Sequence, residues 1–150
     1  MQKCFPINIR DAYFEPVLGV PNSQGTKKVI QIIAPEFSSV CPKTGLPDFG
    51  RVVLRYVPDQ LCVELKAWKM FLMSFYGVGT FHEDATQRIA DEFTRAIAPR
   101  WCNIAIDWSA RGGVHTCTQL TWTRDKGYIS YPEHWENPLF MKAADEWQNR

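Results

Sequence analysis

A cysteine and a carboxylate lie seven residues apart in one turn-rich stretch of the chain. The stretch, from Ser38 to Phe49, contains Cys41, Asp48, two prolines and a glycine. A cysteine attacks as its thiolate, and a nearby acid can protonate the group that gains negative charge in the attack. Because proline and glycine narrow the choice of backbone conformations, we expect a loop that fixes the thiol relative to the carboxyl group. The same residues also fit a small, buried, apolar Cys41 beside a turn-forming Asp48, so both interpretations stay open.

The size and charge of the chain favour one domain without a nucleic-acid surface. It has 150 residues, enough to bury a core, and a net charge of +1 with the two signs interleaved. We therefore expect a single domain over residues 1–150 and no nucleic-acid partner. No apolar run approaches the roughly 20 residues that span a bilayer, and the start lacks the apolar core of a signal peptide. These features predict a cytoplasmic protein without membrane contact.

The cysteines and histidines do not form a metal-binding pattern. The five cysteines are an odd number and contain no CxxC pair, and the three histidines do not lie at zinc-ligand spacing from them. We expect reduced thiols and no metal ion.

The first half of the chain contains three runs typical of strands. Residues 28–34 and 50–58 are rich in β-branched side chains, and Pro35 is expected to stop the first run. Residues 59–60 predict a turn that returns residues 61–64 alongside 50–58 as a hairpin. Residues before this region are expected to form an irregular arm with a short strand.

Two helical patterns follow. Residues 65–75 carry apolar side chains at helical spacing, and two glycines follow them. Residues 81–97 repeat apolar side chains at every fourth position, with Thr80 as the expected cap and Pro99 as the stop. These segments predict two helices in succession.

The second half returns to strand patterns. Residues 101–108 and 114–123 predict two strands joined by a turn, and alternation within 103–107 predicts one buried and one solvated face. The order describes an α+β fold, a four-stranded antiparallel sheet with two helices on one face. We expect residues 1–27 to form an arm and the aromatic-rich residues 124–150 to form a tail that packs onto the body or a neighbour.

Four segments in a fixed order carry a resemblance to a known family. They are the Cys41 loop, Glu64–Phe71, Phe81–Asp84 and Arg111–Gly113. Together they resemble the QueF family of NADPH-dependent nitrile reductases, which reduce 7-cyano-7-deazaguanine to 7-aminomethyl-7-deazaguanine on the route to the tRNA base queuosine. The resemblance covers about residues 30–117. It implies the tunnelling fold (T-fold), whose small sheets close into barrels between subunits, and so a homo-oligomer such as a pentameric ring or a decamer.

The resemblance also implies roles for individual side chains. Cys41 would attack the nitrile to give a covalent thioimide, Asp48 and His82 would supply protons, and two NADPH molecules would supply the hydrides. Acidic side chains would hold the deazaguanine, and basic side chains beside a flexible glycine would hold the NADPH phosphates. The acidic residues are Glu64 and Glu83, and the cofactor set is Lys66, Lys69, Arg111 and Gly112. The chain contains no GxGxxG sequence, so a Rossmann site is not expected.

The same residues have simpler interpretations as well. His82 and Glu83 fit the start of a helix, where the dipole stabilises a carboxylate, and the basic residues fit an ordinary surface. At Ser74–Val78 this chain reads Ser-Phe-Tyr-Gly-Val, whereas the family commonly has Ser-Phe-Arg-Asn-His. Two alternatives therefore stay open. One is a QueF-like amidinotransferase that adds ammonia to the same nitrile, and the other is a non-catalytic purine- or pterin-binding T-fold protein in which Glu83 binds and Cys41 is idle.

Overall fold

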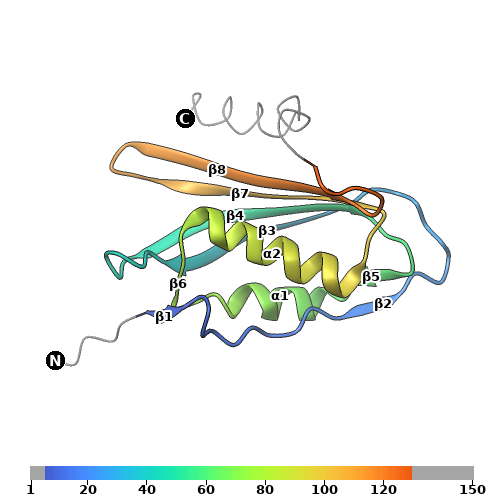
Figure 1. Cartoon of the computed structure of the whole chain (residues 1–150), viewed down its shortest axis with the longest axis horizontal. Helices are drawn as coiled ribbons and strands as arrows, with labels where there is room; N and C mark the ends of the chain where they lie inside the picture. Colours follow the sequence, from blue (N-terminus) through green and yellow to red (C-terminus); the bar gives the residue numbers. More distant parts are fainter. Residues whose placement is uncertain (1–5, 130–150) are drawn as a thin grey trace.

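Four long antiparallel strands form the centre of the molecule. The computed structural model describes residues 6–129. Two helices lie on the same face of the sheet (Figure 1), which confirms the α+β class. The strands are β3 (Ile30–Val40), β4 (Pro47–Val57), β7 (Trp101–Arg111) and β8 (Val114–Thr123), neighbours in that order, and the helices are α1 (Leu65–Met73) and α2 (His82–Ile97).

Short strands make the sheet larger than the four strands predicted. Its seven strands run in the order β1-β6-β3-β4-β7-β8-β9, and β6 pairs in parallel with both β1 and β3. A separate two-stranded sheet joins β2 and β5. The arm expected to be mostly irregular thus supplies two strands, whereas the part of the expected tail from residue 130 onward lies outside the described residues. The short strands are β1 (Ile7–Asn8), β2 (Gly19–Pro21), β5 (Leu61–Val63), β6 (Val78–Gly79) and β9 (Gly127–Tyr128).

The predicted hairpin between β4 and residues 61–64 is wrong. Strand β5 pairs antiparallel with β2, Cys62 lying opposite Val20. Strand β4 is hydrogen-bonded to β3 on one edge and to β7 on the other, so neither edge is open to a third partner. The turn after β4 therefore leads the chain out of the central sheet and into β5, which α1 follows directly.

Pro35 does not end its strand. Strand β3 continues to Val40, and its pairing with β4 shifts by one residue between Ala34 and Phe37. A bulge and a sheet edge both tolerate a residue without an N–H group. The other edge of β3 pairs, among the described strands, only at Val40 with Gly79 of β6. The expected loop over residues 38–49 therefore shrinks to the connection after Val40, and Asp48 lies on β4.

The helices bury their apolar faces against the sheet. In α2 the fourth-position repeat is buried as predicted, except that Phe81 precedes the helix and is half exposed. Thr80 does not cap α2, because Phe81 is the N-cap residue and the Thr80 hydroxyl donates to the Phe81 carbonyl. In α1 Leu65, the first of the apolar residues at helical spacing in 65–75, is 63% exposed. The buried side chains of α1 are Ala67, Trp68, Phe71 and Leu72, and those of the α2 repeat are Ala85, Ile89, Phe93 and Ile97.

The predicted solvated face of β7 is also wrong at Asn103 and Ala105, whereas Asp107, the third residue of that face, is partly exposed. Asn103 and Ala105 are 0% and 7% exposed, as deeply buried as the apolar residues between them. The Asn103 amide nitrogen donates to the Thr121 hydroxyl on β8, so a neighbouring strand takes the place of water for this N–H group.

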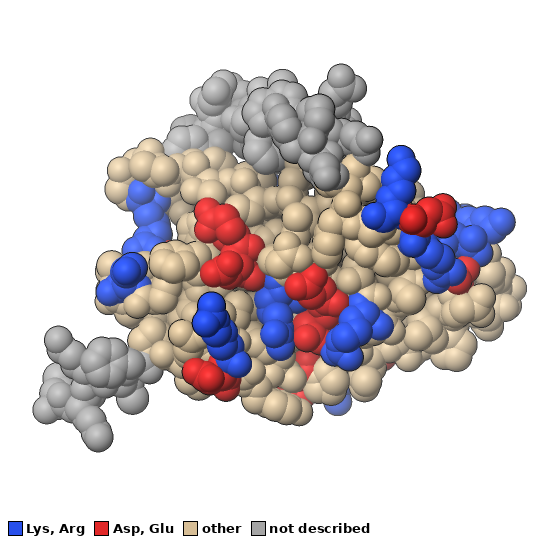
Figure 2. Space-filling model, viewed as in Figure 1, with Lys and Arg blue, Asp and Glu red and all other residues tan. Residues whose placement is uncertain are grey.

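The surface and the helices add two observations. Figure 2 shows basic and acidic side chains interleaved on the viewed face and not gathered by sign. Neither of the described helices is long and apolar enough to cross a membrane.

Candidate active site

A tight connection between β3 and β4 holds Cys41. The Cys41 N–H donates to the Leu46 carbonyl at 2.9 Å, and the Gly45 N–H donates back to the Cys41 carbonyl at 2.9 Å. Gly45 has a φ of +71°, in the left-handed region that side chains disfavour. Glycine therefore lets the chain reverse here, and the reversal fixes Cys41 at the end of β3.

The surroundings of Cys41 favour its thiolate. Hydrogen bonds from the Thr44 side chain and backbone, and then from the Lys43 backbone, lower the pKa of the thiol from 9.0 to about 7. The Arg111 side chain adds a smaller contribution, while burial opposes the shift. At neutral pH a large fraction of Cys41 is thus in the form that attacks an electrophile. The alternative of a deeply buried, apolar Cys41 does not fit, because this thiol is only partly buried.

Asp48 lies on β4 and is 3% exposed. Arg111, the last residue of β7, donates a hydrogen bond to one carboxylate oxygen. Nε2 of His82 lies 3.4 Å from the other carboxylate oxygen. Ser39 is opposite Asp48 on β3, and its buried hydroxyl has no hydrogen-bond partner among the described residues. The strand thus presents a carboxylate that is already oriented by two basic side chains.

His82 begins α2 and stacks on Trp108 of β7. The two ring centroids are 3.9 Å apart and the planes differ by 6°. Figure 1 shows the β3–β4 connection, the start of α2 and the β7–β8 turn at the same end of the sheet. The structure therefore brings together Cys41, Asp48 and His82, which were predicted as catalytic, and adds Arg111 to them. We call these four residues the thiol cluster.

The acidic residues predicted to bind substrate lie in two places. Glu83 is exposed in the first turn of α2, next to His82. Glu64 caps α1, and its two carboxylate oxygens accept the N–H groups of Lys66 at 2.9 Å and Ala67 at 2.7 Å. These backbone bonds lower the pKa of Glu64. Glu83 adjoins the thiol cluster, whereas Glu64 is engaged at the start of the other helix, and both substrate roles remain predictions.

The predicted cofactor residues also separate. Lys66 and Lys69 are exposed on α1, and Lys69 borders a groove of about 430 Å³ between α1 and β3. Arg111 and Gly112 lie at the β7–β8 turn, beyond the start of α2 in Figure 1, and Arg111 pairs with Asp48. Gly112 has a φ of +55°, which this turn needs. Within one chain these residues therefore do not form a single phosphate site.

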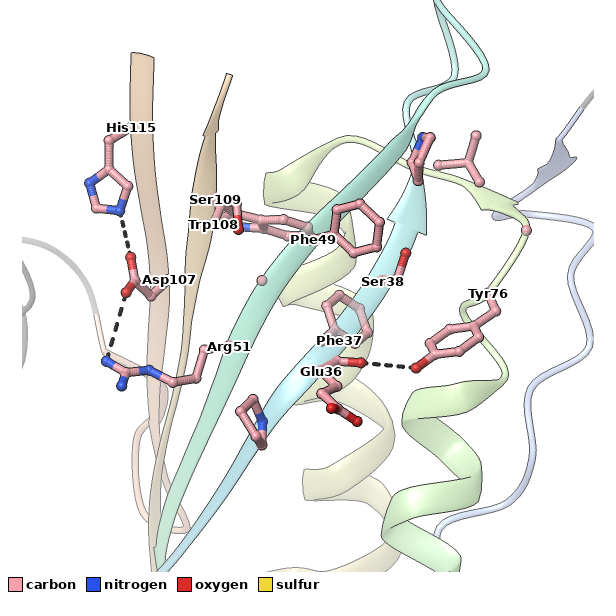
Figure 3. A pocket seen from close by; sticks show the side chains of 15 residues that line it. Glu36, Phe37, Ser38, Phe49, Arg51, Tyr76, Asp107, Trp108, Ser109 and His115 are labelled. Carbon is pink, nitrogen blue, oxygen red and sulfur yellow. Dashed lines mark hydrogen bonds and ion pairs between the residues drawn. The ribbon is translucent and has the colours of Figure 1, made fainter. Parts of the chain in front are cut away.

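A larger hollow of about 780 Å³ is lined mainly by residues of β3, β4 and β7 (Figure 3). Val40 and Pro47, the residues before Cys41 and Asp48, line it. Its polar wall is Asp107, which pairs with Arg51 at 3.7 Å and with His115 at 2.5 Å. Its aromatic lining comprises Phe37, Phe49, Tyr76 and Trp108.

The turn that departs from the family pattern reaches this hollow. The Tyr76 hydroxyl donates to the Glu36 carbonyl at 2.9 Å, and both residues line the hollow as well as the groove beside α1 (Figure 3). The Tyr76 side chain therefore contacts the bulge of β3 where the hollow and the groove share lining residues.

Sequence reasoning missed several residues that shape the site. Thr44 lies inside the predicted loop, and its position three residues after the thiol was the available signal. Trp108 was read only as the end of a strand, although it continues the buried alternation of Ile104 and Ile106. The pairing of Arg51 with Asp107 follows from strand register, which the sequence does not display.

Comparisons with known proteins agree with these observations. A family model described as QueF-like protein matches residues 47–126. A protein of Chloroherpeton thalassium named NADPH-dependent 7-cyano-7-deazaguanine reductase is 45% identical over 97 residues, which are 65% of this chain and 84% of the relative. An Anaeromyxobacter protein (strain Fw109-5) with the same name is 54% identical over 87 residues, 58% of this chain and 71% of the relative.

A solved structure shares the fold. It is titled as the crystal structure of the archaeosine synthase QueF-Like in the apo form, and it matches with a TM-score of 0.60 at 19% identity. The match covers 64% of this chain and 94% of the other. At this identity the likeness concerns the fold alone. The family model and the relatives nevertheless agree, and the chain belongs to the QueF-like protein family.

Proposed function

We propose that this protein is an NADPH-dependent 7-cyano-7-deazaguanine reductase that supplies the aminomethyl precursor of queuosine. The observation that carries the proposal is the thiol cluster, in which a thiol with a pKa of about 7 lies beside a buried aspartate that is oriented by an arginine and a histidine. Relatives 45% and 54% identical to the chain bear the name of this reductase.

Cys41 begins the reaction. Its thiolate attacks the electrophilic nitrile carbon, a carbon–sulfur bond forms, and one carbon–nitrogen π bond breaks. The nitrogen that gains the electron pair takes a proton, which leaves a neutral thioimide on Cys41. NADPH, when bound, supplies hydride, and two successive hydrides with two protons convert the nitrile to an amine. Departure of the thiolate between the two reductions restores Cys41.

Asp48 and His82 handle the protons. Asp48 lies on the strand that follows the Cys41 turn, and its carboxyl group is proposed to protonate the substrate nitrogen. His82 Nε2, 3.4 Å from Asp48, is proposed to return the proton between steps. Such contacts are often long in unliganded enzymes and tighten when substrate binds. Glu83, next to His82 and exposed, is proposed to accept the ring N–H groups of the deazaguanine.

The groove beside α1 suits the cofactor. Its apolar walls can cover a planar ring, and Lys69 at its border, with Lys66 one turn earlier, supplies charge for phosphates. This fit supports NADPH binding on α1, where the family resemblance also puts it. Glu64 would hold this end of the helix in place through its cap.

A ring of subunits would bring the separated residues together. Strand β3 is largely unpaired on one edge, and β8 pairs with β9 only at Trp122 and Thr123 among the described strands. Two open edges favour head-to-tail pairing between copies of the chain, as in a T-fold barrel. Such a ring would lay the β7–β8 turn of one subunit, with Arg111 and Gly112, beside the neighbour's β3.

The direct test is a turnover assay. The protein is mixed with 7-cyano-7-deazaguanine and NADPH, and NADPH loss and product mass are followed together. Two NADPH consumed for each aminomethyl product is the expected result. Conversion of the nitrile only when ammonia is present, without NADPH loss, would replace reduction by amidine formation. Binding of the base without any conversion would leave only the non-catalytic alternative.

A further inference from the structure

A chain of hydrogen bonds connects Trp108 to the backbone of His82. The indole Nε1 of Trp108 donates to the Thr118 hydroxyl at 3.0 Å. The Thr118 and Thr86 hydroxyls are 2.6 Å apart, and the Thr86 hydroxyl donates to the His82 carbonyl at 2.9 Å. The indole ring also stacks on the His82 ring, so the contacts form a closed circuit around this histidine.

The direction of this hydrogen-bond chain follows from its two ends. An indole N–H can only donate and a carbonyl can only accept. One assignment therefore uses every contact, with Thr118 accepting from Trp108 and donating to Thr86, which donates to His82. Both threonine hydroxyl hydrogens thus take part in this chain of hydrogen bonds. Hydrogen bonds aligned head to tail strengthen one another.

Trp108 is itself firmly held. It is 1% exposed, and Phe37 packs against it edge to face with ring centroids 5.7 Å apart. The His82 ring thus stacks on a tightly packed indole. The His82 carbonyl is connected to the same indole by hydrogen bonds through the hydroxyls of Thr86 and Thr118. A stacked pair of planar rings fixes the plane of the imidazole and the direction in which its nitrogens point.

We propose that Trp108 is a positioning residue, which acts with Thr118 and Thr86 to aim Nε2 of His82 at Asp48. The inference rests on the proposed function, because His82 is the residue that returns the proton to Asp48. It assigns a role to three residues that do not belong to the thiol cluster. Thr118 lies on β8, and Thr86 lies on α2, the helix that begins with His82.

The test compares three threonine variants of the full-length protein. Thr118→Val keeps the side-chain shape but removes the acceptor of the indole N–H, whereas Thr118→Ser keeps the hydroxyl. Thr116→Val makes the same change two residues away on β8 and serves as the matched control. Trp108→Leu removes the stack, but Trp108 is a core residue whose loss also weakens the fold, so the Thr118 pair decides the question.

The first measurement is the proton NMR spectrum of the unliganded protein. Ring protons of His82 lie over the indole face and should resonate upfield of a free histidine, an assignment confirmed by their loss in His82→Gln. Thr118→Val should move these signals, whereas Thr118→Ser and Thr116→Val should leave them in place. The ring of His115, which pairs with Asp107, provides an internal control that no variant should move.

The second measurement is turnover. Displacing a catalytic group by about 1 Å can cost up to about a hundredfold in rate, so Thr118→Val should lower kcat by about ten- to a hundredfold. Formation of the Cys41 adduct without NADPH and the KM for NADPH should stay at wild-type values, and Thr118→Ser should restore kcat. Wild-type kcat in a folded Thr118→Val, or equal losses in Thr116→Val, would overturn the inference. Failure of the proposed function would appear differently, as a wild type that does not reduce the nitrile.

Discussion

Two aspartates at opposite ends of β4 use arginine in different ways. Asp48, near the start of the strand, pairs with Arg111 and lies beside His82. Asp59, just after its end, pairs with Arg100 at 2.6 Å and with Arg124. Arg111 is the last residue of β7, whereas Arg100 directly precedes β7 and Arg124 directly follows β8.

The difference lies in the second partner of each carboxylate. Both partners of Asp59 are guanidinium groups, which stay charged at every relevant pH, so this cluster can only hold the strand ends together. Asp48 has one guanidinium partner and one imidazole partner, and the Cys41 thiol also contacts its arginine. The same ion-pair pattern therefore holds the strand ends together at one end of β4, and at the other it orients the carboxylate that is proposed to transfer protons.

The largest expected effect is the loss of Cys41. Intact-mass measurement should show one covalent adduct when the wild type meets 7-cyano-7-deazaguanine without NADPH, because a thiolate and a nitrile need no hydride to combine. Cys41→Ala should form no adduct and show no turnover. The rate of adduct formation should rise as pH increases through about 7, since the thiolate is the reacting form and its pKa is about 7.

Cys62→Ala is the matched control for this experiment. Cys62 is also a partly buried free cysteine, but it lies on β5 and outside the thiol cluster. This variant should form the adduct and turn over like the wild type. An adduct that persists in Cys41→Ala would move the nucleophile elsewhere.

The next effect is the exchange of each aspartate for asparagine. Asp48→Asn should slow turnover by roughly 10²–10⁴-fold, because an amide cannot deliver a proton as a carboxylic acid does. Asp59→Asn should leave turnover per folded molecule unchanged. Steady-state rates with far-ultraviolet circular dichroism on both variants make the comparison. Equal rates in the two variants would show that Asp48 only shapes its end of the sheet.

A smaller effect is expected from the basic residues. A charge-assisted hydrogen bond contributes about 1.5–3 kcal/mol, so Lys66→Ala should raise the KM for NADPH about tenfold or more and leave adduct formation unchanged. Arg111→Ala should raise the same KM if a ring brings Arg111 to the cofactor, and should also slow adduct formation, since Arg111 contacts both Cys41 and Asp48. Adduct rates measured without NADPH separate the two effects. If Lys66→Ala keeps the wild-type KM for NADPH, Lys66 on α1 does not bind the cofactor.

Local patterns predicted the elements that such patterns control. The fourth-position repeat of α2 gave that helix and its buried face correctly, because side chains four residues apart lie on the same side of a helix. The resemblance likewise singled out Cys41, Asp48 and His82, which the structure brings to one end of the sheet.

Contacts between distant segments were the part that the sequence could not supply. Asp48 and Arg111 are 63 residues apart, and their contact depends on the register of β4 against β7. The bulge of β3 at Pro35 depends on which strand edge is left open. Neither property is encoded in a short window of residues, so the pairing of Arg111 with Asp48 was not predicted and the strand was ended too early.

The Asp59→Asn substitution should have the smallest effect on activity and the clearest effect on thermal stability. A hydrogen bond from Arg124, helped by the charges of Arg100 and Arg124, holds the pKa of Asp59 below its ordinary value. The folded state thus binds the proton less tightly than the unfolded chain, so the pair contributes stability above the ordinary aspartate pKa of about 4 and loses it as pH falls through the lower folded value. Thermal unfolding should therefore show a melting temperature for Asp59→Asn below that of the wild type at pH 7. The gap should narrow as the solution is acidified below pH 4, where the wild type loses the same ion pair. A gap that stays constant across this range would mean that Asp59 stabilises the sheet by its shape and not by its charge.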